Sequence, residues 1–103
     1  MLIQIVRFKS GLPEEQVVKT YEGRAAQYRA VKGLVQKYYL RFRETGEHGA
    51  VYLWQSEDAL NDFRKSDLYR TIPSAYQVQG SPHVQMADLV MALRPELEKA
   101  ERA

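Results

Sequence analysis

The sequence predicts an α+β fold of the ferredoxin-like type, an antiparallel sheet with helices on one face. Two observations predict it. Strand-like and helix-like segments follow one another in the order β-α-β-β-α-β. Turn or helix-capping residues stand between most of these segments. A chain of 103 residues can bury a core of its own, so we expect residues 1–103 to form a single domain.

The first strand is predicted at residues 2–8, a β-branched and apolar run that ends before Gly11. Pro13 then opens a helix, because the first helical position does not need its missing N–H. Gly33 ends this helix. Residues at helical spacing predict its buried face: Val18, Tyr21, Ala25 and Tyr28.

A hairpin follows the first helix. Residues 34–43 are predicted as the second strand and residues 50–55 as the third. The turn at 44–49 contains two glycines, and we expect His48 to be exposed in it.

A second helix begins at Ser56, whose hydroxyl suits a helix N-cap. Leu60 and Phe63 mark its buried face. Residues 67–76 predict one or two further helical turns, which are broken near Pro73.

The fourth strand is predicted at residues 83–93, directly after Pro82. Pro95 opens a short, charged C-terminal helix.

Apolar residues occupy both faces of the first strand, with Leu2 and Val6 on one face and Ile3 and Ile5 on the other. Two helices cover only one face of a sheet, and a monomer rarely exposes a large apolar patch. A second copy related by a two-fold axis is the simplest cover. We therefore predict a homodimer, alone or paired into a dimer of dimers.

The composition narrows the function. The chain has no cysteine, which excludes disulfides and thiolate-held metals and fits a cytoplasmic protein. The net charge of +2, with interleaved charges, gives little support for a nucleic-acid partner. No apolar run approaches the ~20 residues that a membrane-spanning helix needs. The first residues lack the basic flank of a signal peptide.

Several side chains on the strands could bind a flat aromatic molecule. Tyr39, Tyr52 and Trp54 lie on two strands expected to be neighbours, and Gln4 is a polar residue within an apolar strand. Aromatic rings would stack on such a ligand and their polar tips would orient it. The alternative is that these residues belong to the core or to a subunit interface.

Lys37 and His83 are the candidates for proton transfer. A cavity lysine could stabilise a phenolate or act as a base with a lowered pKa, whereas a rim lysine would reach solvent. His83 opens the predicted fourth strand, where a base could stand at a cavity mouth. The spacing of His83 and His48 matches no metal site, so we expect no metal ligands. Asp88 could be a buried acid partner of Arg7 or Lys37, or form an ion pair at an interface.

Several segments together resemble the antibiotic biosynthesis monooxygenase superfamily of dimeric α/β-barrel proteins, in particular its branch of small monooxygenases. They are Gly33-Leu34-Val35-Gln36-Lys37-Tyr38-Tyr39, Gly49-Ala50-Val51-Tyr52-Leu53-Trp54, Ser56-Glu57-Asp58-Ala59-Leu60, Phe63 and Ser66-Asp67-Leu68-Tyr69. The resemblance implies two sheets paired face to face, with a cavity between sheet and helices in each subunit. Some members oxygenate aromatic polyketides with molecular oxygen and no cofactor, while others degrade haem or isomerise lactones. Haem-degrading members bind iron through a helix histidine, and neither predicted helix here contains one.

The leading hypothesis is a cofactor-independent monooxygenase that acts on a small aromatic or quinol-like molecule. Its site would contain Gln4, Lys37, Tyr39, Tyr52, Trp54 and His83. A non-catalytic dimer that binds a small hydrophobic molecule is the second hypothesis, and an isomerase or lyase on the same scaffold is the third. Nucleic-acid binding ranks last, because the aromatic-rich strand motif of RNA binders with this fold is missing.

Overall fold

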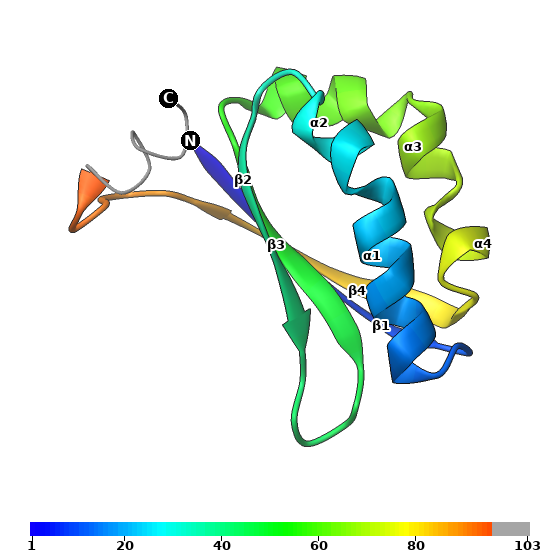
Figure 1. Ribbon diagram of the computed structural model, residues 1–103. Coiled ribbons are helices and arrows are strands. Elements are labelled where there is room, and N and C mark those ends of the chain that lie inside the picture. Colours follow the sequence, from blue (N-terminus) through cyan, green and yellow to red (C-terminus); the bar gives the residue numbers. More distant parts are fainter. Residues whose placement is uncertain (96–103) are drawn as a thin grey trace.

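A computed structural model of the chain describes residues 1–95 and shows a curved four-stranded antiparallel sheet with its helices on one face (Figure 1). The elements in chain order are β1 (Leu2–Ser10), α1 (Glu14–Arg29), β2 (Leu34–Arg41), β3 (His48–Trp54), α2 (Glu57–Arg64), α3 (Asp67–Arg70), α4 (Ile72–Ala75) and β4 (Val78–Asp88). The order of strands across the sheet is β2-β3-β1-β4. The predicted fold class is confirmed. The predicted C-terminal helix lies outside the described residues.

Strands β1 and β3 form the centre of the sheet and approach each other closely at Gly49. Gly49 pairs with Arg7 in the antiparallel register. A Cβ atom at Gly49 would lie 1.9 Å from the carbonyl oxygen of Val6. Only glycine fits this position, since any side chain would push the two strands apart.

Helix α1 begins after Pro13, as predicted, but its buried face differs from the prediction. Val17 is fully buried, whereas Val18 is 44% exposed. The inward face therefore follows residues 17, 21, 24 and 28, a spacing of three to four that is equally helical. Arg24, which is partly buried, therefore shares this face with Tyr28.

The second helical region matches the prediction closely. The Ser56 hydroxyl accepts a hydrogen bond from the backbone N–H of Ala59 at 3.1 Å, which caps α2. Leu60 and Phe63 are buried on its inner face. The predicted further turns are the short helices α3 and α4, and Pro73 stands in the first turn of α4.

Strand β4 starts and ends five residues earlier than the predicted 83–93. Pro82 lies within it, although proline donates no hydrogen bond to a sheet. The position is tolerated because β4 is an edge strand, whose outer side has no neighbour. The ladder with β1 also shifts register between Arg7 and Lys9.

The third strand, which forms the hairpin with the second, begins earlier than predicted. Strand β3 begins at His48, which pairs with Phe8 on β1 and with Arg41 on β2. The expectation that His48 is exposed is therefore wrong: it is 7% exposed. Strand β2 ends at Arg41, because Phe42 already belongs to the turn and pairs with Glu47 and Gly46 through its backbone.

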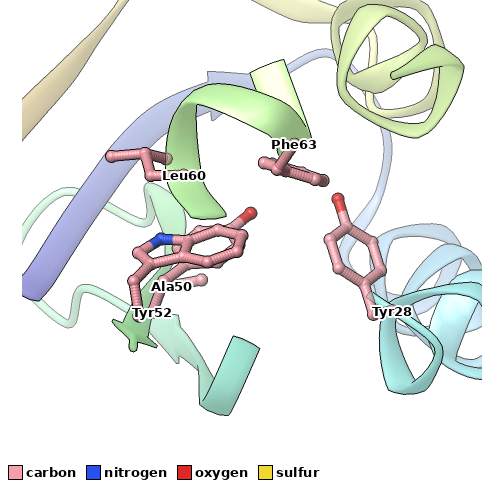
Figure 2. Packing of buried hydrophobic residues seen from close by; sticks show 6 residues of the cluster. Tyr28, Ala50, Tyr52, Leu60 and Phe63 are labelled. Atoms are coloured by element: carbon pink, nitrogen blue, oxygen red, sulfur yellow. The ribbon is translucent and has the colours of Figure 1, made fainter. Parts of the chain in front are cut away.

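The core lies between the sheet and the helices. Six buried residues, which we call the Trp54 cluster, fill one part of this layer: Tyr28, Ala50, Tyr52, Trp54, Leu60 and Phe63 (Figure 2). The Tyr52 and Trp54 rings stack with centroids 5.8 Å apart, and Phe63 packs 5.2 Å from Trp54. A smaller group of Phe8, Val17 and Tyr76 packs separately.

The helices within residues 1–95 all lie on one side of the sheet, and none of them covers the opposite face (Figure 1). Strand alternation and the register place Ile3 and Ile5 of β1 on this face, with Tyr38 of β2 and Val51 of β3. The Tyr38 side chain is 57% exposed. The sequence-based expectation of apolar residues on both faces is confirmed for these strands.

Candidate functional site

A cavity of about 360 Å³ lies between the sheet and the helices. This volume is typical of sites for small organic ligands. Four of the six predicted site residues line it: Gln4, Lys37, Tyr39 and Tyr52. They come together because β2, β3 and β1 are neighbours and these side chains share one face of the sheet. In the register, Tyr52 lies opposite both Lys37 and Gln4.

Lys37 stands in the cavity wall with its ammonium group among three tyrosine rings. Nζ lies 3.3 Å from the ring centroid of Tyr28, 4.4 Å from that of Tyr39 and 4.6 Å from that of Tyr52. Burial lowers the pKa of Lys37 from its ordinary 10.5 to about 7, and the nearby Arg24 adds to this shift. The ring faces attract the charged form and act in the opposite direction. A large share of Lys37 amines is thus neutral in mildly alkaline solution.

Gln4 is held in place by Trp54. The indole Nε1 of Trp54 donates a hydrogen bond of 3.0 Å to the side-chain carbonyl Oε1 of Gln4, and both residues are buried. Because Oε1 is engaged, the amide N–H groups are what Gln4 can offer to a ligand. Trp54 itself is fully buried and is not among the residues that line the cavity. It therefore positions Gln4 rather than stacking on a ligand.

Two tyrosine hydroxyls in the cavity wall, those of Tyr21 and Tyr76, are buried and have no hydrogen-bond partner among the described residues. Burial raises the pKa of Tyr21 to about 12, and it raises the pKa of Tyr76 as well. The Tyr21 and Tyr76 phenols therefore remain protonated and can donate hydrogen bonds to a ligand oxygen.

Tyr21 and Tyr76 were not predicted as site residues. The helical spacing already placed Tyr21 on the buried face of α1, and that face was the available signal. Tyr76 follows the short helix α4, and no sequence pattern indicates where that segment packs.

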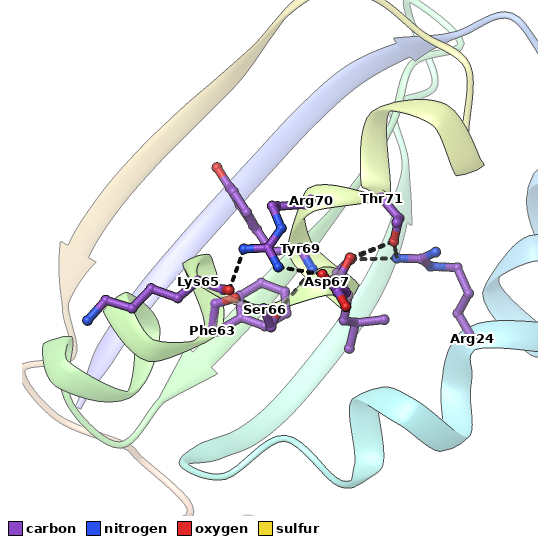
Figure 3. Close-up of polar contacts among 9 residues, drawn as sticks. Arg24, Phe63, Lys65, Ser66, Asp67, Tyr69, Arg70 and Thr71 are labelled. Atoms are coloured by element: carbon purple, nitrogen blue, oxygen red, sulfur yellow. Dashed lines mark hydrogen bonds and ion pairs between the residues drawn. The ribbon is translucent and has the colours of Figure 1, made fainter.

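Arg24 ties α1 to the segment of α3 and α4 that covers the cavity (Figure 3). Its Nη2 donates to the carbonyl of Leu68 at 2.6 Å and to the hydroxyl of Thr71 at 3.2 Å. Thr71 in turn donates to the carbonyl of Asp67 at 2.8 Å. Arg24 thus connects α1 to the α3–α4 segment through hydrogen bonds. It also places a positive charge near Lys37.

The charged side chains of the cavity wall are all basic among the described lining residues. Besides Lys37, the wall includes Arg64 and Arg70, and no Asp or Glu is among its described lining residues. Arg70 is oriented by an ion pair with Asp67 and by a hydrogen bond to the carbonyl of Lys65 at 2.6 Å (Figure 3). Such a wall favours a ligand that carries, or develops, negative charge.

The remaining predicted site residue, His83, lies outside the cavity. It is exposed on β4 opposite Arg7, and its neighbours Pro82 and Val84 are the ones that line the cavity. Strand alternation therefore places the imidazole on the other face of the sheet. Sequence reasoning did not separate the two faces of β4, because both carry apolar residues.

Asp88 is not the buried acid that its sequence context suggests. It is exposed at the end of β4, opposite Leu2. Arg7 instead forms an ion pair with Glu47, at 3.5 Å between Nε and Oε1. Within residues 1–95, no cluster of three His, Asp or Glu side chains could hold a metal ion. No helix in that same part of the chain is long and apolar enough to cross a membrane.

A second cavity of about 680 Å³ lies beside α1 and β2. Arg29, Gln36 and Gln55 give it a polar lining. Tyr28, Lys37 and Tyr39 line both cavities. Lys37 thus stands between an apolar cavity on one side and a polar one on the other.

Solved structures share this fold over most of the chain. A candidate antibiotic biosynthesis monooxygenase from Caulobacter crescentus superposes with a TM-score of 0.74 at 20% identity, covering 87% of this chain and 90% of that one. SnoaB, a cofactor-independent oxygenase from Streptomyces nogalater, gives 0.72 at 15% identity, over 89% and 95% of the two chains. Rv0793 from Mycobacterium tuberculosis gives 0.72 at 17% identity, over 89% and 97%.

Comparisons of the sequence itself give no further relative. A scan against protein-family models finds no match, and a search of curated proteins finds no significant one. The resemblance to the antibiotic biosynthesis monooxygenases is confirmed at the level of the fold.

Proposed function

We propose that this protein is a cofactor-independent monooxygenase that acts on a small aromatic or quinol-like molecule bound in the 360 Å³ cavity. The observation that carries the proposal is the Lys37 amine, enclosed by tyrosine rings in the cavity wall. Its lowered pKa supports a role as a base near neutral pH. The fold shared with SnoaB, described as a cofactor-independent oxygenase, is consistent with the proposal.

The chemistry needs an electron-rich anion. Lys37 would accept a proton from an acidic C–H or O–H of the substrate, and the resulting anion would give one electron to oxygen. Recombination would form a peroxide anion at that carbon, and Lys37 would return its proton to make the hydroperoxide. Lys37 would then remove the remaining C–H proton while the O–O bond breaks, and that proton with the leaving hydroxide would form water and leave a carbonyl. In the net reaction a CH₂ group and O₂ become C=O and H₂O, so the substrate supplies every electron.

The other side chains of the cavity suit these reaction steps. The unpartnered hydroxyls of Tyr21 and Tyr76 would donate hydrogen bonds to the developing oxyanion. Arg64 and Arg70 would favour its charge. The ring of Tyr52 would lie against the aromatic part of the substrate and keep water away.

Oxygen uptake with a panel of anthrones and quinols tests the proposal. We expect turnover by the wild type and a loss of about a hundredfold in kcat for Lys37→Met, since a positioned base typically contributes at least that much. Lys32→Met, which removes an exposed lysine, is the matched control. No oxygen uptake with any compound, or full activity of Lys37→Met, would overturn it. Ligand returned unchanged would indicate a binding protein, and conversion without oxygen an isomerase or lyase.

We also propose that a second copy of the chain covers the open face of the sheet. The exposed Tyr38 and the neighbouring Ile3, Ile5 and Val51 support this pairing, since burying them would remove apolar surface from water. Native mass spectrometry tests it, with a dimer or tetramer expected. A strict monomer at micromolar concentration would contradict it.

A further inference from the structure

Lys37 differs from the other described lysines in its surroundings. Lys9, Lys19, Lys32 and Lys65 are exposed, whereas Lys37 is partly buried among rings from three elements. These rings belong to Tyr28 on α1, Tyr39 on β2 and Tyr52 on β3. The ion pairs of the described residues do not include Lys37, and neither cavity that it lines contains a described carboxylate.

Two conditions that make a lysine nucleophilic meet at this position. The amine is withdrawn from water in a largely apolar site, and a second cation, Arg24, disfavours its protonation. A neutral amine carries a free electron pair, whereas an ammonium group does not.

We propose that Lys37 forms an imine with an aldehyde or ketone that binds in the 360 Å³ cavity, so that the site accepts aromatic carbonyl compounds as covalent, reversible ligands. This inference uses the same cavity as the proposed function, but it assigns Lys37 as a nucleophile rather than only as a base.

The step balances without another reagent. The Nζ electron pair attacks the carbonyl carbon, and the C=O bond opens to a hydroxyl on a tetrahedral carbinolamine. Loss of that hydroxyl as water forms the C=N bond, and the amine loses both of its protons in the process. Addition of water reverses the reaction and releases the carbonyl compound unchanged.

The apolar cavity suits this step. It has room for an aromatic ring, and the unpartnered hydroxyls of Tyr21 and Tyr76 can donate to the carbonyl oxygen and then to the hydroxyl of the carbinolamine. The polar cavity of about 680 Å³ is also lined by Lys37.

Reductive trapping tests the proposal. The wild type is incubated without oxygen at pH 8 with limiting benzaldehyde and sodium cyanoborohydride, and is then analysed by intact mass and peptide mapping. We expect one benzyl group at Lys37, which should be modified at least about tenfold more than any exposed lysine, because Lys37 alone among the described lysines stands in the cavity wall where the ring of the aldehyde can bind. The α-amino group of Met1 is also a primary amine, and mapping keeps its adduct separate.

Two variants sharpen the test. Lys37→Arg keeps the positive charge but cannot form an imine, so its cavity adduct should disappear, whereas Lys32→Arg should label like the wild type. Adducts spread evenly over the exposed lysines of the wild type, with no excess at Lys37, would overturn the proposal. The wild-type map alone decides this, even if Lys37→Arg fails to fold.

The outcome is independent of the oxygenase assay, because trapping involves no oxygen. Trapping without oxygen uptake would retain the imine and reject the monooxygenase. Oxygen uptake without trapping would reject the imine and leave Lys37 as a base.

Discussion

The layer between sheet and helices contains two parts that treat their polar groups in opposite ways. In the part of the Trp54 cluster that does not line the cavity, Trp54 and Leu60 are fully buried, and the indole N–H of Trp54 is hydrogen-bonded to Gln4. The cavity wall next to it leaves the hydroxyls of Tyr21 and Tyr76 without partners and a lysine among aromatic rings. Buried polar groups without partners lower the stability of the folded state, so their presence in the cavity wall indicates a site for a ligand.

The largest expected effect is in the Trp54 cluster. Trp54→Ala should lower the free energy of unfolding by about 3–5 kcal/mol, because it opens a cavity in a close-packed core and leaves Gln4 without its donor. Urea unfolding followed by circular dichroism measures this. Trp54→Phe should cost less, since it removes the hydrogen bond but keeps most of the volume. A loss below about 1 kcal/mol for the alanine variant would mean that this region is not the packed one.

A neighbouring pair on α1 sharpens the comparison. Val17 is fully buried and Val18 is 44% exposed, so the same substitution samples opposite environments one residue apart. Val17→Ala should cost about 2 kcal/mol and Val18→Ala less than about 0.5 kcal/mol. A larger cost for Val18→Ala than for Val17→Ala would place the buried face of α1 where its sequence pattern predicts it.

Lys37 should make stability depend on pH. Its folded-state pKa of about 7 lies below the ordinary 10.5, so the unfolded chain binds more protons between these values. Stability should therefore rise as the pH increases from 7 toward 10. The groups facing Lys37 are Arg24, Tyr28, Tyr39 and Tyr52.

Thermal unfolding of the wild type and Lys37→Met at pH 7 and pH 9 measures this contribution. The wild type should gain about 1 kcal/mol or more relative to the variant over this range. Above pH 10 the raised pKa of Tyr21 acts in the opposite sense, because the unfolded chain then binds fewer protons. A constant difference between the two proteins would show that the Lys37 pKa is not lowered.

The smallest effect on stability is expected from the unpartnered hydroxyls. Tyr21→Phe should change the free energy of unfolding by less than about 0.5 kcal/mol, or raise it, because no protein hydrogen bond is lost. The same variant should weaken the binding of a ligand that accepts a hydrogen bond there, as isothermal titration would show. Tyr38→Phe, at a 57% exposed residue on the opposite face of the sheet that does not line the cavity, is the control. A clear loss of stability would mean that the Tyr21 hydroxyl has a structural partner.

The sequence by itself determined the element order, the capping residues and the fold class, because turns, caps and periodic apolar residues act within a few positions of one another. It also placed Lys37 with Tyr39, and Tyr52 with Trp54, on one face of their strands, since side chains alternate once a strand is located. It misplaced β4 and the inward face of α1. On α1 a rotation by one residue is consistent with the same apolar pattern, and in β4 apolar residues on both faces leave the start of the strand open.

Only the tertiary structure decided which of these side chains surround an empty space. Trp54 and Tyr52 are two residues apart on β3, so their side chains lie on the same face of the sheet. Trp54 is nevertheless buried against α2, whereas Tyr52 lines the cavity. Tyr76 and Arg24 join the site because α1, α3 and α4 fold over the sheet. Local sequence specifies the periodicity with which side chains alternate along a strand or helix. The burial and pKa of a side chain, and the volume of a cavity, depend instead on the residues that pack against it, and these lie far away along the chain.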